Sequence, residues 1–233
     1  MIKCEVVILA NGDFPTPAVP LSLLENAKHI VACDGVIASL AEHDDRHQNV
    51  VVVGDGDSVP DTLRDRLIQI DEQDDNDLTK ATRYCLEQGW HKIAYVGATG
   101  KREDHTLGNI SLMVRYFLEM GVEPVLVTDY GWFVVAQGDT AFESFPGQQV
   151  SIFNVNCRHL VSEGLKWQAY PFHQFWQGTL NEALSTDFSL HADGCYLVYR
   201  TFFFFFLSIC IILRNFAADY YKRVCRQTVI YRV

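Results

Sequence analysis

The stretch VVVVGDGDS, residues 50 to 58, places two carboxylates at the end of an apolar run. Four consecutive valines without polar alternation are typical of a strand buried on both faces, as in a parallel sheet. Asp55 and Asp57 follow, with one glycine between them. Two like charges this close repel each other unless a cation lies nearby. The stretch therefore predicts a parallel sheet with a positively charged partner at its edge.

Apolar runs and amphipathic stretches alternate through the first part of the chain, residues 1–138. Strands are expected at 4–9, 29–33, 50–53, 92–96 and 124–128, and helices at 36–42, 77–88 and 105–119. This alternation indicates an α/β domain whose mostly parallel sheet is covered on both faces. Ligands of such sheets collect at the carboxyl ends of the strands.

Residues 139–200 have a different texture, with short strand-like runs separated by turn residues. Strands are expected at 140–145, 149–155, 160–163, 188–191 and 196–199. The pattern predicts a smaller, all-β sandwich domain. Residues 201–233 form an atypical tail that begins TFFFFFLSICIIL. This apolar run is shorter than the roughly 20 residues of a spanning helix, and we interpret the tail as a fused or frame-shifted extension and not a functional module.

The composition narrows the class of protein. The 233 residues are 48% hydrophobic and 21% charged, which predicts a packed globular chain, and the net charge of −10 argues against a nucleic-acid partner. The seven cysteines form no CxxC pair and are expected to be free thiols in a reducing cytoplasm. The first residues predict a strand and not a signal peptide, so a cytoplasmic location without a membrane partner is expected.

A second acidic segment, DEQDDNDLTK at 71–80, precedes one of the expected helices. By itself it is also compatible with a solvated loop in which Asp77 lies at a helix N-terminus. However, the segment is expected on the same sheet edge as Asp55 and Asp57, and so many carboxylates together need a cation. Mg²⁺ prefers such ligands together with substrate phosphates. Lys80 could pair with Asp77 or reach a phosphate.

The third polar stretch, YVGATGKREDHTLGNI at 95–110, is predicted to be a strand, a glycine loop and a helix. Backbone N–H groups of such a loop can hold a phosphate, although the spacing is not that of a Walker A loop. Lys101 and Arg102 beside the loop, with Asp104 after them, suit a polyphosphate and a metal ion together. His105 could act as a base, but a histidine at the start of a helix more often has a structural role. The three stretches favour phosphoryl-type transfer.

The order of these motifs resembles the thiamine pyrophosphokinase family, of the bacterial type. That family carries G-D-x-D-S, D-Q-D-x-T-D-x-x-K and G-x-x-G-x-R-x-D-H segments. The corresponding stretches here are GDGDS (54–58), EQDDNDLTK (72–80) and GATGKREDH (97–105). In the β part, SEGLKW (162–167) and GTLNE (178–182) are similar to two further family segments. The likeness covers about residues 1–200.

The resemblance implies transfer of pyrophosphate from ATP to the hydroxyl of thiamine, giving thiamine diphosphate and AMP, with Mg²⁺ as cofactor. It also implies a homodimer with the sites between the subunits. By position, the metal ligands would be Asp55, Asp57, Asp74 and Asp77, which together with Asp104 near the reacting hydroxyl form the catalytic set. ATP would be bound by Asp34, Lys80, Thr99, Gly100, Lys101 and Arg102. Thiamine would be contacted by Trp167 and Asn181, from the other subunit.

The chain departs from the family pattern at several positions. Glu72 replaces an aspartate, and Gly56 replaces a larger residue between the two aspartates. Leu180 stands where the family has serine, which removes a hydroxyl donor from the thiamine end of the site.

Two other functions stay open at this point. A haloacid-dehalogenase-like phosphatase would use Asp55 as the nucleophile and Asp57 as the acid and base. In that class the motif normally lies on the first strand, whereas here it is expected on the third. The second alternative is a non-catalytic nucleotide or metal sensor, which the sequence does not exclude.

Overall fold

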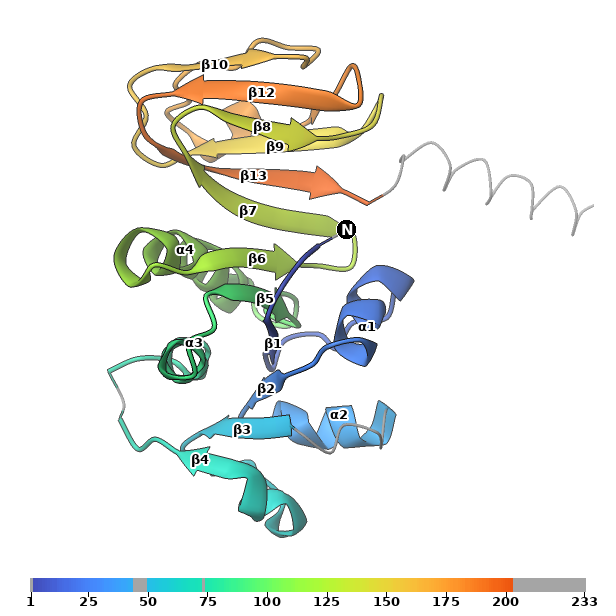
Figure 1. The fold of residues 1–233 in the computed structure, drawn as a ribbon, viewed down its shortest axis with the longest axis vertical. Helices are drawn as coiled ribbons and strands as arrows, with labels where there is room; N and C mark the ends of the chain where they lie inside the picture. The colour runs from blue at the N-terminus through green and yellow to red at the C-terminus, as the bar shows by residue number, and fades with distance from the viewer. Residues whose placement is uncertain (1, 44–49, 73, 203–233) are drawn as a thin grey trace, which may run out of the picture.

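The computed structural model describes residues 2–43, 50–72 and 74–202, so most of the predicted tail lies outside the described residues. Its lower half in Figure 1 is built on six parallel strands in the order β4-β3-β2-β1-β5-β6. These strands are β1 (Val6–Leu9), β2 (Ile30–Cys33), β3 (Val50–Gly54), β4 (Leu67–Gln69), β5 (Lys92–Val96) and β6 (Glu123–Val127). Strands β1, β2 and β5 are buried at almost every position, as expected of the interior of a parallel sheet.

Helices cover both faces of this sheet. They are α1 (Ala18–Glu25), α2 (Val36–His43), α3 (Asp77–Glu87) and α4 (Glu103–Met120), with a short 3₁₀ helix η1 (Asp61–Arg66) before β4. Helices α3 and α4 contribute to one buried cluster, through Cys85 and Met113 among others, and α1 and α2 contribute to the other, through Leu24 and Ile37. Figure 1 shows the two pairs on opposite sides of the sheet.

The C-terminal part continues the same sheet and adds a second one. Strands β7, β13, β9 and β11 extend the large sheet beyond β6 with antiparallel pairing, and β10, β12 and β8 form a three-stranded sheet. Their bounds are β7 (Gly131–Gln137), β8 (Thr140–Glu143), β9 (Gln149–Asn154), β10 (Leu160–Glu163), β11 (Asn181–Glu182), β12 (Asp187–Ala192) and β13 (Cys195–Thr201), with the 3₁₀ helix η2 (Phe175–Gly178) between β10 and β11. A third apolar cluster lies between the two sheets.

The predicted fold class is confirmed: a mostly parallel α/β part is followed by an antiparallel β part. The sheet passes from one part to the other without a break, because β7 pairs with β6 on one side and with β13 on the other. The predicted boundary at residue 138 stays a prediction.

Several elements were not predicted, among them one helix and two strands that shape the sheet. Helix α1 contains Pro20, which normally ends a helix, but here the proline lies in the first turn, where its missing N–H is not needed. Strand β4 is only three residues long and mostly exposed. Strand β7 carries the aromatic and β-branched run GWFVVAQ, which is a strand signal.

The described cysteines are all free, and four of them are buried: Cys33, Cys85, Cys157 and Cys195. The expectation of free thiols is confirmed for the described cysteines. None of the helices within the described ranges is long and apolar enough to cross a membrane.

Candidate active site

An open cleft of about 400 Å³ lies at the carboxyl ends of β1, β2 and β5. Strand order reverses at β1, since β2 and β5 flank it on opposite sides, and such a switch point is where ligands of open α/β sheets bind. The cleft is lined by Ala10, Asn11, Gly12, Cys33, Asn76, Asp77, Leu78, Ala98, Gly100, Lys101, Arg102, His105 and Asn109. The predicted ligand-binding edge and the cleft therefore coincide.

The loops that follow β1 and β5 are bonded to each other through their backbones. The N–H of Gly12 donates to the carbonyl of Gly97 at 2.7 Å, and the N–H of Asp13 donates to the carbonyl of Thr99 at 2.9 Å. A Cβ atom on Gly12 would lie 2.3 Å from the Thr99 oxygen and 2.4 Å from the Gly97 oxygen. Only glycine permits this approach, and the two loops form one wall of the cleft.

Lys101 lies in this wall with a left-handed backbone (φ 54°). Its Nζ donates to both the carbonyl oxygen and the Oδ1 of Asn11, each at 3.1 Å. The side chain is exposed and reaches across from the β5 loop to the β1 loop. A fixed ammonium group beside N–H groups of a glycine loop suits a phosphate.

Arg102 and Asp104 form an exposed ion pair at the start of α4. The Arg102 Nε and a terminal nitrogen donate to the two carboxylate oxygens at 3.1 and 2.6 Å, and the His105 N–H donates to Asp104 at 2.9 Å. The bond from Arg102, helped by the His105 N–H, lowers the pKa of Asp104. Asp104 is therefore ionised at neutral pH and a weak base.

The GDGDS turn is fastened to the end of β2. Asp34 is buried, and its Oδ2 accepts the Gly56 N–H at 2.8 Å. A Cβ atom on Gly54 would lie 2.4 Å from the Asp34 Cβ, so the glycine is required for this packing. The Asp57 N–H donates to the Asp55 Oδ1 at 3.2 Å. The turn thus places Asp55 and Asp57 directly beyond β3, on the third strand as predicted.

Asp77 begins α3 and lines the cleft. Asn76 caps the helix, since its side chain accepts the Thr79 N–H at 3.0 Å. Lys80, one turn later, is only 3% exposed, and its Nζ lies 3.5 Å from the Asp77 Oδ1. Burial raises the pKa of Asp77, and nearby Asp55 adds to this, while Lys80 opposes it. Asp55 and Asp77 are therefore close enough to repel each other.

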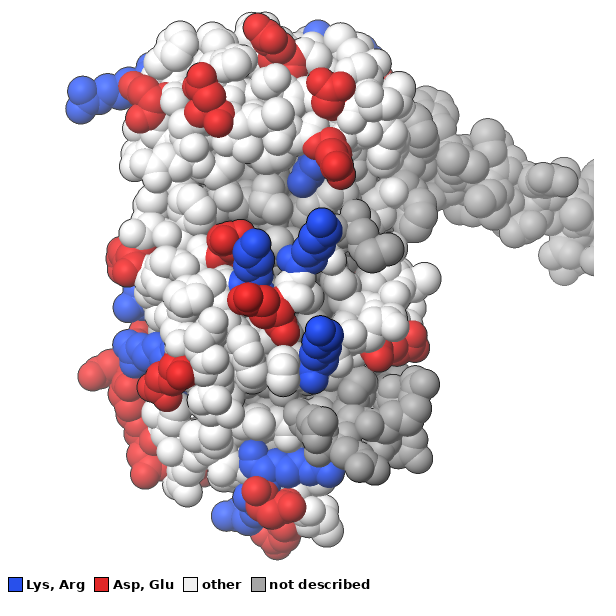
Figure 2. Space-filling model, in the orientation of Figure 1, with Lys and Arg blue, Asp and Glu red and all other residues white. Residues whose placement is uncertain are grey.

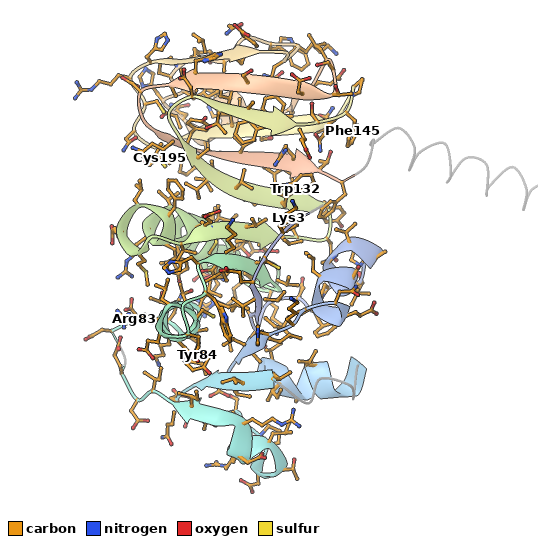
Figure 3. The ribbon with its side chains drawn as sticks, in the orientation of Figure 1. Lys3, Arg83, Tyr84, Trp132, Phe145 and Cys195 are labelled. Carbon is orange, nitrogen blue, oxygen red and sulfur yellow. The ribbon has the colours of Figure 1, made fainter. Side chains whose placement is uncertain are left out.

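Two arginines hold the segment that precedes α3. Arg83 donates one nitrogen to both Glu72 oxygens, at 3.1 and 3.0 Å, and another to Asp75. Arg115, on α4, donates to the other Asp75 oxygen at 3.0 Å. Figure 3 shows Arg83 on the side of α3 that faces the connection from β4. Neither arginine is among the predicted site residues, because the partners come from separate elements.

These ion pairs neutralise part of the negative charge of the acidic segment. Figure 2 shows acidic side chains along the left edge, at the height of α3 and the β4–α3 connection, with basic side chains beside them. Glu72 and Asp75 have arginine partners, whereas Asp74 is exposed and makes no ion pair within the described part of the chain. The segment therefore divides into paired and available carboxylates.

The donor chemistry of the site fits a hard cation, although no closed cage is formed. Within the described ranges, no group of three or more His, Cys, Asp or Glu side chains is arranged to hold a metal ion. Mg²⁺ usually takes one or two carboxylates together with substrate phosphates, so a closed cage is not needed. The buried Asp34 Oδ1, which has no hydrogen-bond partner among the described residues, adds a further oxygen near Asp77.

The predicted thiamine residues lie in the β part. Trp167 is 54% exposed and Asn181 is buried. The Asn181 side chain accepts the Trp167 N–H at 3.1 Å and donates to the Trp167 carbonyl at 2.7 Å, so it braces the tryptophan. The Lys166 ammonium lies 4.8 Å from the indole centroid and 3.4 Å from a Glu182 oxygen. The backbone of Trp167 is thus braced, and its indole is exposed with the Lys166 ammonium over one face.

The cleft and this tryptophan do not come together within one chain, because no described residue beyond Asn109 lines the cleft. Leu180, which replaces the family serine, is 74% exposed and has a left-handed backbone (φ 64°). No packing contact among the described residues explains why leucine stands at this exposed position.

Comparisons with known proteins identify the family to which both parts of the chain are similar. Residues 21–123 match the family described as the thiamin pyrophosphokinase catalytic domain, and residues 131–199 match the thiamin pyrophosphokinase substrate-binding domain. Together they cover well over half of the chain. Thiamin pyrophosphokinase 1 of Caenorhabditis elegans is 30% identical over 142 residues, which are 54% of this chain and 55% of that protein. The chain thus aligns with about half the length of this curated relative.

Solved structures of low sequence identity share the fold. The thiamine pyrophosphokinase from Bacillus subtilis is 20% identical with a TM-score of 0.68, covering 84% of this chain and 98% of its own. The thiamin pyrophosphokinase from Candida albicans is 16% identical with a TM-score of 0.67, covering 84% of this chain and 89% of its own. Neither the phosphatase nor the sensor receives support from these comparisons. With both domain families matched in order along one continuous fold, the chain belongs to the thiamin pyrophosphokinase family.

Proposed function

We propose that this protein transfers the pyrophosphate group of ATP to the hydroxyl of thiamine, in a Mg²⁺-dependent reaction that yields thiamine diphosphate and AMP. The hydroxyl oxygen forms a bond to the β-phosphorus, the bond from that phosphorus to the AMP oxygen breaks, and the hydroxyl proton is lost. The observation that carries the proposal is the cleft at the strand-order switch, where the 97–102 loop faces the first turn of α3.

The cleft and the acidic turns beside it each have a part in this reaction, with Asp77 as the one of the four carboxylates that lines the cleft among the described residues. Lys101 would bind the phosphates, and Arg102 adds a second cation on the same side. The Gly100 N–H donates to the Thr106 hydroxyl at 3.1 Å and so shapes the loop. Asp55, Asp57, Asp74 and Asp77 are the carboxylates that would hold Mg²⁺, with one or two bound directly. The metal ion would offset the charge that develops on the phosphate oxygens. Lys80 and Asp34 act from buried positions behind these groups.

Asp104 lies near the reacting hydroxyl in this proposal, but as an ionised group. Because Arg102 lowers its pKa, it is a poor proton acceptor and a good hydrogen-bond acceptor. Its contribution is to orient Arg102 and the incoming hydroxyl, which matches a reaction whose catalysis is mainly positioning.

Thiamine would bind at Trp167, whose indole face suits a cationic thiazolium or a flat pyrimidine. Asn181 serves by bracing the tryptophan. Since Trp167 does not line the cleft of its own chain, we propose a homodimer in which the β part of one subunit covers the cleft of the other. Six of the eleven exposed large apolar side chains among the described residues lie in residues 167–184, namely Trp167, Tyr170, Phe175, Trp176, Leu180 and Leu184, as expected of an interface. A cytoplasmic location remains part of the proposal.

The reaction is tested by incubating the protein with ATP, Mg²⁺ and thiamine and separating the nucleotide products. AMP together with thiamine diphosphate supports the proposal. ADP would indicate a single phosphoryl transfer, free phosphate would indicate the phosphatase, and no product would indicate the sensor.

The shared site is tested by complementation between two inactive variants. Asp57→Asn impairs the cleft and Trp167→Ala impairs the thiamine side, so a mixed dimer retains one intact site. Co-expression should restore about a quarter of the wild-type activity if dimers form at random. Activity that stays at the level of the two variants alone would place both residues in one subunit's site.

A further inference from the structure

We propose that Asp75 is a positioning residue that acts through Arg83 and Arg115 to hold the acidic segment, so that Asp74 and Asp77 are available to the metal ion. This inference rests on the proposed function. It concerns a position that lies between the acidic residues of the motif and that the resemblance leaves without a role.

The segment 70–76 needs side-chain contacts to hold its position. It connects β4 to α3, and its described residues belong to no helix or strand. The Ile70 N–H donates to the Gly54 carbonyl at 2.8 Å, so backbone pairing fixes only the start of the segment. Asn76 caps α3 and fixes only the last residue before the helix. Something else must determine where Asp74 lies.

Asp75 supplies that contact with both of its oxygens. One oxygen accepts from Arg83 on α3, and the other accepts from Arg115 on α4 at 3.0 Å. The carboxylate is only 11% exposed, whereas the two arginines are 42% and 40% exposed. Because α3 and α4 pack on the same face of the sheet, the aspartate fixes the segment relative to both helices at once.

The neighbouring pairs extend this connection. Arg83 also holds Glu72, three residues before Asp75, so the segment is attached on both sides of Asp74. Arg115 also pairs with Glu119 at 3.3 Å, one turn further along α4. The segment is thereby anchored through Glu72 and Asp75, and Asp74 is left between two fixed points.

Asp75 is not itself suited to bind the metal ion. Both of its oxygens already accept from guanidinium groups, and a cation would have to displace two charged donors. Groups that orient the ligands of a metal typically change its affinity by 10- to 100-fold when they are removed. We therefore expect effects of that size from Asp75 without direct contact.

The test measures Mn²⁺ binding by electron paramagnetic resonance in the presence of α,β-methylene-ATP, which cannot release AMP. In Asp75→Asn and in Arg115→Lys the Mn²⁺ dissociation constant should rise about 10-fold. Arg115→Lys keeps the charge but loses the planar fork, and Arg115→Gln should weaken binding as well. Glu119→Gln removes the other partner of Arg115 and is the matched control, with a change below about 2-fold expected for an exposed pair.

The two arginine variants separate positioning from long-range charge. If Arg115 influenced the site only through its charge, Arg115→Lys would be unchanged and Arg115→Gln would bind Mn²⁺ more tightly, and either result overturns the proposal. Amide hydrogen exchange of residues 74–77 in the metal-free protein is the second readout. It should be faster in Asp75→Asn, and unchanged exchange would also count against the role.

Failure of the proposed function gives a different result. A wild-type protein that forms AMP while all four variants bind Mn²⁺ equally well would overturn the role of Asp75 alone. A wild-type protein that binds no Mn²⁺ with the nucleotide would overturn the metal site itself, and the role of Asp75 with it.

Discussion

Replacing Gly12 by alanine should displace the phosphate-binding wall of the cleft. The new Cβ would meet two backbone oxygens at 2.3 and 2.4 Å, whereas carbon and oxygen normally stay about 3.3 Å apart. One loop must therefore move by about 1 Å, and neither oxygen can yield by a rotamer change because both belong to the backbone.

The cost follows from the bonds that join the two loops. The shift strains or breaks the bonds Gly12 to Gly97 and Asp13 to Thr99, which contribute about 1 kcal/mol each. A loss of about 2 kcal/mol should lower Tm by about 4–8 °C for a chain of this size. A displacement of about 1 Å at the nucleotide site can reduce kcat/KM by about 100-fold.

Gly108→Ala is the matched control for this substitution. Gly108 is exposed within α4, and a Cβ atom at this position would have no neighbouring atom within 4 Å. Alanine favours a helix over glycine by about 1 kcal/mol, so Tm should rise by about 2–4 °C. Thermal denaturation followed by circular dichroism and AMP formation at varied ATP measure both variants. A Gly12→Ala protein with the stability and KM of the wild type would refute the reasoning.

Three further outcomes are expected. Asp57→Asn should abolish AMP formation while leaving the Tm of the metal-free protein nearly unchanged, since Asp57 is exposed and one of two repelling charges is removed. The control is Asp61→Asn, at another exposed aspartate. A large loss of Tm in Asp57→Asn would mean that the Asp55–Asp57 pair is structural. Arg200→Met should lower the free energy of unfolding by about 2–4 kcal/mol in urea titrations, because the guanidinium donates to the Glu143 carbonyl at 2.6 Å across the two sheets and lies over Trp132 and Phe142. Burial lowers the pKa of Arg200 to about 10, so the side chain is still charged at pH 7. An unchanged free energy of unfolding would show that these contacts contribute nothing. Glu5→Ala should lower Tm at pH 7, because the Glu5 carboxylate accepts hydrogen bonds from the N–H groups of Lys92 and His91, which lower its pKa. This stabilisation is present above the usual pKa of 4.5 and is lost as the pH falls through the lowered pKa. The Tm difference from wild type should therefore shrink toward acid pH, and a difference independent of pH would contradict this assignment.

Much of the α/β part could be predicted because its signals are local. Apolar runs of β-branched residues such as Val50–Gly54 are typical of buried strands, and each is followed by polar residues that parallel packing brings to one edge. The acidic and glycine-rich motifs could therefore be placed at that edge from the order of the residues alone. The signal failed for α1, where Pro20 hides a helix by lying in its first turn.

The sequence by itself determined the strand signals, the edge at which ligands collect and the residue types found there. Only the tertiary structure decided which of the carboxylates are available. Asp75 meets Arg115 across 40 residues, and Asn181 meets Trp167 across 14, because these partners are set by how α3 packs beside α4 and how the β part closes on itself. A charge pattern gives the number of acids in a segment, but the ion pairs that neutralise some of them depend on distances between elements that no local pattern encodes.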